Sequence, residues 1–227
     1  MLLSDLNWMD VERYLERDDR IILVTGATEQ HGYLSLLTDA RVPMAIATAV
    51  AEREKVLVAP PLNFGVSPYF AAYPGTLSLR QTTFILVMHD LLTGLAVQGF
   101  RRIFILNGHG GNTAIRPALI EFRNDRPDVK LYWHDWWTSP KVLAYAEQIG
   151  VKPTHANWLE NFPFTRVAEA PSAAKPWPEL GQLMNKDEMR NALGDGSFGG
   201  AYIQPDPVMD HLFEIVVQEV LGLVRAF

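Results

Sequence analysis

The stretch RIFILNGHGGNTAIRPALIEFRND, residues 102–125, contains the pattern that decides the predicted fold. Residues 102–106 are an apolar run of strand length, and residues 107–112 are a turn rich in glycine. Residues 112–125 repeat apolar side chains at the spacing of a helix. A strand that leads through a tight turn into a helix begins a βαβ unit, so this stretch predicts a parallel sheet.

The same alternation runs along most of the chain. Thr38 is the expected N-cap of a helix over residues 39–54, and Gly99 is the expected C-cap of the next helix. We therefore predict an α/β fold, a three-layer α/β/α sandwich whose mostly parallel central sheet is covered on both faces. The other expected strands are residues 21–24, 56–60 and 129–133, and the other expected helices are residues 80–100, 139–150 and 206–227. A first helix is expected to begin near Asn7 or Asp10. Its apolar face contains Trp8, Val11, Tyr14 and Leu15.

Residues 151–207 break this alternation, because they are rich in proline and glycine and contain only short helical patterns. Long irregular segments in compact proteins are usually functional or disordered. We predict one domain over residues 1–227, in which residues 151–207 form an active-site flap or an interface between copies.

The composition limits the classes of protein to which the chain can belong. The 227 residues are 48% hydrophobic and 20% charged, which predicts a substantial core, and the net charge is −6. No basic run is longer than Arg101-Arg102, so neither nucleic acid nor an anionic membrane is expected as a partner. The chain has no cysteine, which excludes disulfides and thiolate metal sites. No signal-peptide pattern and no run of 18 apolar residues is found, so we expect a cytoplasmic protein.

Side chains that bind metals follow two of the predicted strands. Glu29 and His31 come after the first strand, Asp39 begins the following helix, and His109 lies in the NGHGGN turn, residues 107–112. Ligands of parallel sheets bind beyond the carboxyl ends of the strands, where these residues are expected to converge. Two carboxylates and two imidazoles suit Zn²⁺, Mn²⁺ or Fe²⁺.

Simpler explanations exist for each of these residues. An aspartate at a helix start is commonly a cap, and a glycine-rich turn after a strand can bind phosphate through its N–H groups. The NGHGGN turn lacks the lysine of a P-loop and the spacing of a dinucleotide fingerprint. A metal site is favoured, while a non-catalytic module that binds a nucleotide or a phosphate stays the alternative.

The segments TEQHGYLSLLTDA (28–40), YPGT (73–76) and NGHGGN (107–112) resemble the signature segments of the creatininase (creatinine amidohydrolase) family. The resemblance covers roughly residues 20 to 160, with the segments in the family's order. It implies an α/β/α fold, a site for two divalent metal ions and hydrolysis of amide-type C–N bonds. The implied substrate is a small amide, cyclic or open-chain, and the implied assembly is a homo-oligomer, for which the apolar face of the final helix would be suitable.

The resemblance also implies roles for individual residues. Glu29 and His109 would hold one metal, His31 the other, and Asp39 would bridge the two. Gly111 stands where creatininase itself has a glutamate ligand, and family members with NGHGGN use a glutamate of a later H-A-G-x-x-E segment instead. The segment HANWLE, residues 155–160, resembles it, which implies Glu160 for the second metal and His155 for proton transfer.

Residues for the substrate are expected on several loops. The N–H groups of Gly110 and Gly111 are placed to stabilise an oxyanion. Trp136, Trp137 and Tyr73 are predicted to line the substrate pocket, although adjacent tryptophans after a strand can also divide between core and surface. A family member that has lost catalysis and keeps its metals for structure is the third possibility.

Overall fold

The computed structural model describes residues 1–227 and contains a sheet of four parallel strands. The strands lie in the order β2-β1-β3-β4, with β1 and β3 in the centre. Their apolar runs explain this placement, because the two central strands are buried on both faces as parallel strands require. The bounds are β1 Arg20–Thr25, β2 Leu57–Val58, β3 Arg102–Asn107 and β4 Lys130–Asp135.

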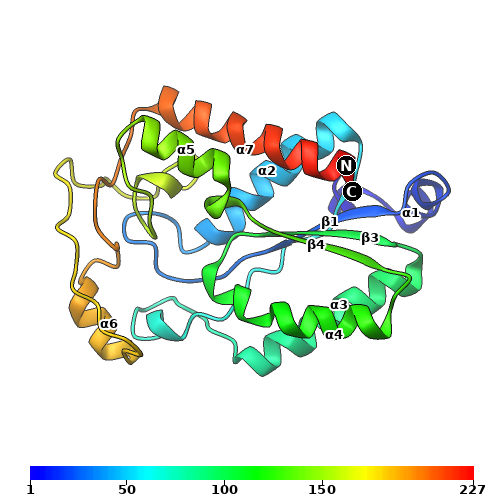
Figure 1. Ribbon diagram of the computed structural model, residues 1–227, viewed down its shortest axis with the longest axis horizontal. Coiled ribbons are helices and arrows are strands. Elements are labelled where there is room, and N and C mark those ends of the chain that lie inside the picture. The colour runs from blue at the N-terminus through cyan, green and yellow to red at the C-terminus, as the bar shows by residue number, and fades with distance from the viewer.

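Helices cover both faces of the sheet, so the predicted three-layer sandwich is confirmed (Figure 1). One face packs against α2 (Thr38–Glu54), α5 (Pro140–Gln148) and α7 (Asp206–Ala226), which are above the sheet in Figure 1. The other face packs against α1, α3 and α4, of which α3 and α4 are below the sheet there. The bounds of these three helices are α1 Trp8–Leu15, α3 Gln81–Gln98 and α4 Arg116–Asp125.

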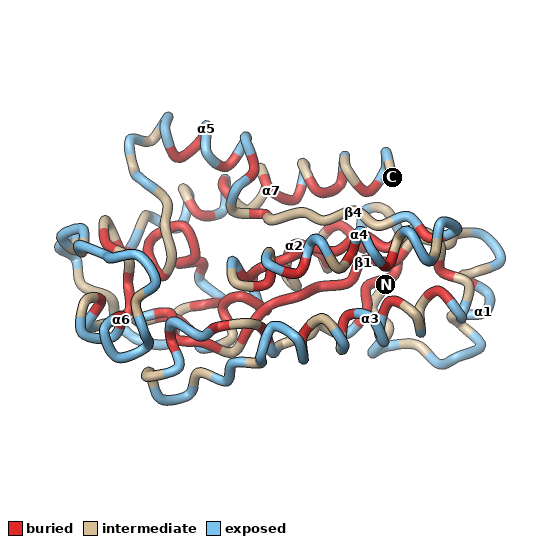
Figure 2. Tube along the Cα trace, turned by 60° about the horizontal axis from the view of Figure 1, so that its bottom comes forward, coloured by how far each residue is buried: buried red, intermediate tan, exposed pale blue.

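Side chains alternate along the strands and create two separate cores. Ile22 and Val24 of β1 face the core with α2, α5 and α7, while Ile21 and Leu23 face the core with α1, α3 and α4. Figure 2 shows β1 buried along most of its length, the edge strand β4 mostly of intermediate burial, and the helices buried along one side only. None of the helices combines the length and the apolar character that a membrane crossing requires.

Helix α7 buries its apolar face within its own chain. Met209, Leu212, Val216 and Val217 are all at most 1% exposed and belong to the larger core. The face is therefore not free to contact a second copy, which removes the sequence argument for an oligomer that rested on it.

Several local predictions differ from the structure. Trp8 is 71% exposed, and of the face expected for the first helix only Tyr14 is fully buried. Thr38 is the first residue of α2 rather than its N-cap, because its hydroxyl donates to the carbonyl of Ser35. The helix expected from residue 112 begins as a 3₁₀ turn, η3 (Gly110–Ile115), and becomes α-helical only at Arg116. Pro117 has no N–H to donate, which places it in the first turn of the α-helix.

The irregular segment lies at the end of the sheet where the strands terminate (Figure 1). Within residues 151–205 the structure has the 3₁₀ turn η5 (Trp158–Glu160) and the short helix α6 (Lys186–Leu193). Helix α6 packs against η2 (Pro68–Phe70), a 3₁₀ turn in the loop after β2. The segment thus covers the edge of the sheet where ligands are expected.

Glycines bring the ends of β1 and β3 against the start of α2. A Cβ atom on Gly26 would lie 2.5 Å from the carbonyl oxygen of Asp39, and one on Gly108 would lie 2.0 Å from the same atom. Only a residue without a side chain permits this approach. The two glycines therefore determine how closely the backbone of Asp39 sits to the strand ends.

We predict that Gly108→Ala destabilises the fold by about 1–3 kcal/mol, because the added methyl group would overlap the Asp39 carbonyl and the Pro43 ring. The matched control is Gly94→Ala in the middle of α3, where an added Cβ meets nothing within 4 Å. This control should raise stability by up to about 1 kcal/mol, because alanine favours a helix more than glycine does. Urea unfolding measures both changes, and equal stabilities of the two variants would contradict the prediction.

Candidate metal centre

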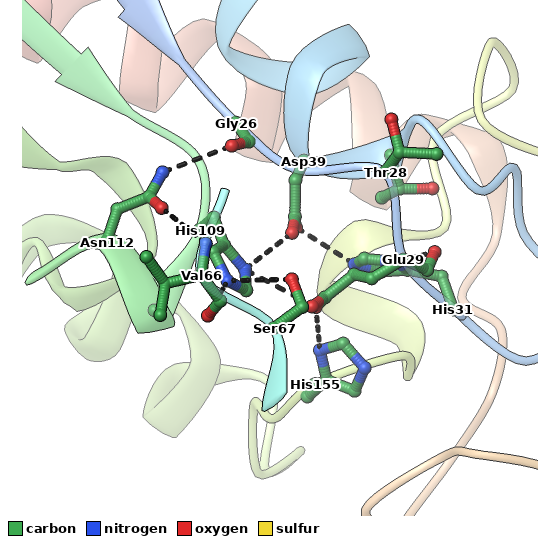
Figure 3. A network of polar contacts seen from close by, with 12 residues as sticks. Gly26, Thr28, Glu29, His31, Asp39, Val66, Ser67, His109, Asn112 and His155 are labelled. Carbon is green, nitrogen blue, oxygen red and sulfur yellow. Dashed lines mark hydrogen bonds and ion pairs between the residues drawn. The ribbon is translucent and has the colours of Figure 1, made fainter. Parts of the chain in front are cut away.

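Five buried titratable side chains from four parts of the chain meet beyond the carboxyl ends of β1 and β3. All five are at most 8% exposed, and Figure 3 shows four of them directed towards one another. The five are Glu29 and His31 in the loop after β1, Asp39 in the first turn of α2, His109 after β3, and Glu160 in η5.

Asp39 lies at the centre of this cluster. Its Oδ1 atom is 2.9 Å from Nε2 of His31, and its Oδ2 atom is 2.8 Å from Nδ1 of His109. Glu29 Oε1 is 3.4 Å from Nδ1 of His109, and Glu160 Oε1 is 3.8 Å from Nε2 of His31. The two oxygens of one carboxylate therefore face two separate groups of ligand atoms.

The cluster divides into two triads that share Asp39. Glu29, Asp39 and His109 form one, and His31, Asp39 and Glu160 form the other, with the ligand atoms of each triad within 4.8 Å of one another. These are the groups that the family resemblance implies for two metals with a bridging carboxylate. Metal ligation by these residues stays a prediction.

Hydrogen bonds to backbone carbonyls orient both imidazoles. Nδ1 of His31 lies 3.1 Å from the carbonyl oxygen of Glu29, and Nε2 of His109 lies 2.9 Å from that of Val66. A carbonyl accepts only, so each of these ring nitrogens carries the hydrogen. The other nitrogen of each ring faces the carboxylates, which is how histidine ligands of metals are usually held.

The cluster has the electrostatics of a cation site. Three buried carboxylates face the two imidazoles of His31 and His109, and unpaired buried charge costs several kcal/mol per ion. Glu29 Oε2 and Asp39 Oδ2 are buried and accept no hydrogen bond, although Oδ2 is close to His109 Nδ1. Divalent cations would satisfy these oxygens and neutralise the excess negative charge, so the residues present fit two hard or intermediate metal ions.

The groups of the cluster also shift one another's pKa values. Burial opposes the charge of His31, but Asp39, Glu160 and Glu29 together raise its pKa to about 10. Burial likewise opposes the charge of His109, and Glu29 and Asp39 raise its pKa well above its usual value. Burial also works against the ionised form of Asp39, yet the two histidines hold the pKa of this carboxyl well below its usual range. Burial raises the pKa of Glu160 to about 7, although His31 opposes the shift.

His155 adjoins the cluster and is uncharged at neutral pH. Burial, with the adjacent charge of His31, holds the pKa of His155 well below its usual value. Its Nδ1 atom is 3.8 Å from Glu29 Oε1, while Nε2 lies 3.0 Å from Nε2 of Gln30. The ring stacks on Phe70 with centroids 4.6 Å apart and planes at 13°. Its ligand atoms also lie close enough to Glu29 and His31 to form a third possible metal group.

A cavity of about 630 Å³ opens onto the cluster. Gly110, Gly111 and Trp137 line it, as the sequence predicts. Trp136 instead lies in the larger core, where it is 1% exposed, because successive residues of a tight 3₁₀ turn point in different directions. Tyr73 lies behind Phe70, with ring centroids 6.3 Å apart, and does not line the cavity.

Some residues around the cluster could not be found from the sequence. Gln30 lies within the TEQHG segment, so its position was visible, but its hydrogen bonds to His155 and to the carbonyl of Gly196 were not. Asn107 accepts from Thr25 and donates to Asp135, which ties together the ends of three strands. The cavity walls formed by Phe70 and Phe198 carry no sequence signal.

A family model described as creatininase, creatinine amidohydrolase, matches residues 4–190. The match covers most of the chain and includes every residue of the cluster. The chain therefore belongs to the creatininase family.

Similar proteins agree with this assignment. The chain is 31% identical over 162 residues to a creatinine amidohydrolase of Pseudomonas putida, an alignment that covers 66% of this chain and 62% of that protein. It is 34% identical over 107 residues to a mycofactocin precursor peptide peptidase of Mycolicibacterium smegmatis, covering 44% and 43%. The chain thus spans less than two thirds of either relative. A mutant creatininase structure described as the Zn-Zn type has the same fold, with a TM-score of 0.79, 24% identity and coverage of 99% and 97%.

We predict that metal binding at pH 7 releases about two to three protons, because His31 and His109 must each lose a proton to become ligands and Glu160, with its pKa near 7, must lose part of one. The affinity for Zn²⁺ or Mn²⁺ should therefore rise with pH between 6 and 8. Calorimetric titration in two buffers with different ionisation enthalpies measures the number of protons. Binding with no proton released to the buffer would contradict the prediction.

Proposed function

We propose that this protein is a metal-dependent hydrolase that cleaves the C–N bond of a small amide with an activated water. The observation that carries the proposal is the position of Asp39, whose two oxygens face two triads of buried ligand atoms. Membership of the creatininase family supports it, as do relatives named amidohydrolase and peptidase. Both names describe cleavage of amide-type bonds.

The proposed site holds two divalent metal ions. Glu29 and His109 would bind one ion, His31 and Glu160 the other, and Asp39 both. Nitrogen and oxygen donors of this kind accept Zn²⁺, Mn²⁺ or Fe²⁺, and the structure described as Zn-Zn belongs to a protein of the same fold. When bound, such a pair of ions lowers the pKa of water towards 7 and polarises the amide carbonyl.

The remaining residues orient the substrate and move a proton. His155 is placed to take a proton from the attacking water and to give it to the nitrogen that leaves, so that the C–N bond breaks as the C–O bond forms. The N–H groups of Gly110 and Gly111 donate to no other group of the chain and can stabilise the negative charge that develops on the carbonyl oxygen. Trp137 also lines the cavity, next to Gly110.

The alternative of a phosphate-binding module is less well supported. The Gly110 and Gly111 turn borders the same cavity as Glu29, Asp39 and Glu160, and three carboxylates repel an anion unless cations lie between them. Phosphate binding would therefore itself require the metals.

We expect Asp39→Asn to lose at least one metal ion per chain and to abolish amide hydrolysis, because the neutral side chain cannot bridge two cations. The matched control is Glu12→Gln, which removes an exposed carboxylate of α1. Metal content after purification without chelator, measured by mass spectrometry, and turnover of a panel of lactams, cyclic ureas, formamides and short peptides test this. An Asp39→Asn protein that keeps both ions and full turnover would contradict the proposal that Asp39 binds both metals.

We expect His155→Gln to keep the metals and to lower kcat by about 10²–10⁴-fold, because only proton transfer is lost. The measurement pairs metal content with the pH dependence of kcat for any amide that the parent protein cleaves. A variant that loses metal would instead identify His155 as a ligand, since its ring nitrogens lie near Glu29 and His31.

The assembly and location of the protein also stay proposals. We propose a homo-oligomer in the cytoplasm, with residues 151–207 as the flap over the site or as part of the interface. Sedimentation of the purified protein tests the assembly, and cell fractionation tests the location.

A further inference from the structure

We infer that the cavity has an apolar subsite, lined by Phe70, Met189, Phe198 and Leu143, which accepts an uncharged apolar substituent of the amide and excludes an anionic one. The inference rests on the proposed amide hydrolysis and names the class of amide that the site takes. It comes from the walls of the cavity and not from the metal cluster at its floor.

The volume of the cavity is larger than the volume of an amide group bound at the proposed metals. Its volume of about 630 Å³ lies within the range of about 300–1,000 Å³ that is typical of pockets for drug-sized ligands. Apolar side chains dominate the part beyond the cluster, among them Tyr69, Phe70, Trp137, Leu143, Met189 and Phe198. A substituent attached to the amide therefore has both room and apolar contacts.

One wall of this subsite is a small core of its own. Phe70, Met189 and Leu193 form a buried cluster between η2 and α6, and Phe198 packs against it with its ring 6.0 Å from that of Phe70 at 64°. Arg190 ties α6 to this cluster, because its guanidinium donates to the carbonyl of Ala72 at 2.7 Å. The wall is thus formed before any ligand binds, so a ligand does not have to order it.

The cavity offers no cationic side chain to a second anionic group. Its 21 lining residues include no lysine and no arginine, and the only acidic ones are the three carboxylates of the cluster. Basic residues nearby are committed elsewhere: Lys175 is bound to Asp195 and to the carbonyl of Ser197, and Lys152 lies over the ring of Trp177. A carboxylate or phosphate in the subsite would lose its hydration without gaining an ion pair.

The rim of the cavity leaves apolar surface in water. Tyr69 is 43% exposed and Leu143 is 46% exposed, and both side chains line the cavity. Covering such surface with an apolar group is favourable in proportion to the area removed from water.

Three hydroxamates test the subsite by binding, without requiring turnover. Each would chelate the metals through the same group, while the remainder is a methyl group in acetohydroxamate, a phenyl ring in benzohydroxamate and a carboxylated ring in 4-carboxybenzohydroxamate. We expect the metal-loaded protein to bind benzohydroxamate about tenfold more tightly than acetohydroxamate. The carboxylated ring should lower affinity at least about tenfold relative to benzohydroxamate. Calorimetry or thermal shift gives the dissociation constants.

Two variants test whether the residues of the subsite cause these ratios of affinity. Phe198→Ala should reduce the preference for benzohydroxamate over acetohydroxamate, because part of the apolar wall is gone. Leu143→Lys adds a cation at a half-exposed position and should reverse the discrimination against the carboxylated ring. The matched control is Leu91→Lys on α3, which is 39% exposed and outside the cavity, and which should leave both ratios unchanged.

The outcomes separate this inference from the proposed function. If acetohydroxamate does not bind to the metal-loaded protein, no cation is accessible in the cavity, and both the proposed function and the subsite fall. If acetohydroxamate binds but neither ratio responds to Phe198→Ala or Leu143→Lys, the metal site stands and the subsite is wrong.

Discussion

The carboxylate of Asp39, held between His31 and His109, is the interaction on which the rest of the site depends. It is 3% exposed and stands at the first turn of α2, where free N–H groups and the helix dipole favour a negative charge. Two imidazoles lie against it, and in the proposed enzyme two cations would replace their protons. In both cases the carboxylate of Asp39 links His31 in the loop after β1 to His109 in the loop after β3.

The fold makes this arrangement possible through close backbone packing. Gly26 and Gly108 let the ends of β1 and β3 touch the backbone of Asp39, and Gly111 allows the turn after His109 to approach the carbonyl of Val66. The same carbonyl orients the ring of His109. The glycines of the NGHGGN turn thus act through backbone positions, which explains why a turn that looks like a phosphate loop surrounds a histidine instead.

The segment after residue 150 completes the site from the other side. It supplies Glu160 to one triad, places His155 against Phe70, and brings α6 to form the apolar wall of the cavity. The metal cluster is built mostly on the ends of the sheet, whereas the walls that would select the substrate come from this irregular part of the chain. A single family can in this way keep one kind of chemistry and change the compounds on which it acts.

The sequence alone predicted the layers of the fold and four of the five side chains that meet in the cluster, Glu29, His31, Asp39 and His109. Both depend on local patterns: apolar runs of strand length, apolar residues at helical spacing, and polar residues directly after strands. Glu29, His31 and His109 could be predicted for the same reason, because each lies in a short segment directly after a strand. Glu160 was found only through the resemblance to the creatininase family.

Only the tertiary structure decided which of two adjacent side chains faces the core and which faces the cavity. Trp136 and Trp137 are adjacent residues of the same type, yet Trp136 packs in the core and Trp137 lines the cavity. The partners of Gln30, the stacking of His155 on Phe70 and the wall around Phe198 likewise join residues far apart in the chain. Such contacts form only when whole layers of helices and strands pack against each other. A local sequence pattern predicts one helix or strand at a time, so it does not predict which side chains of distant segments come into contact.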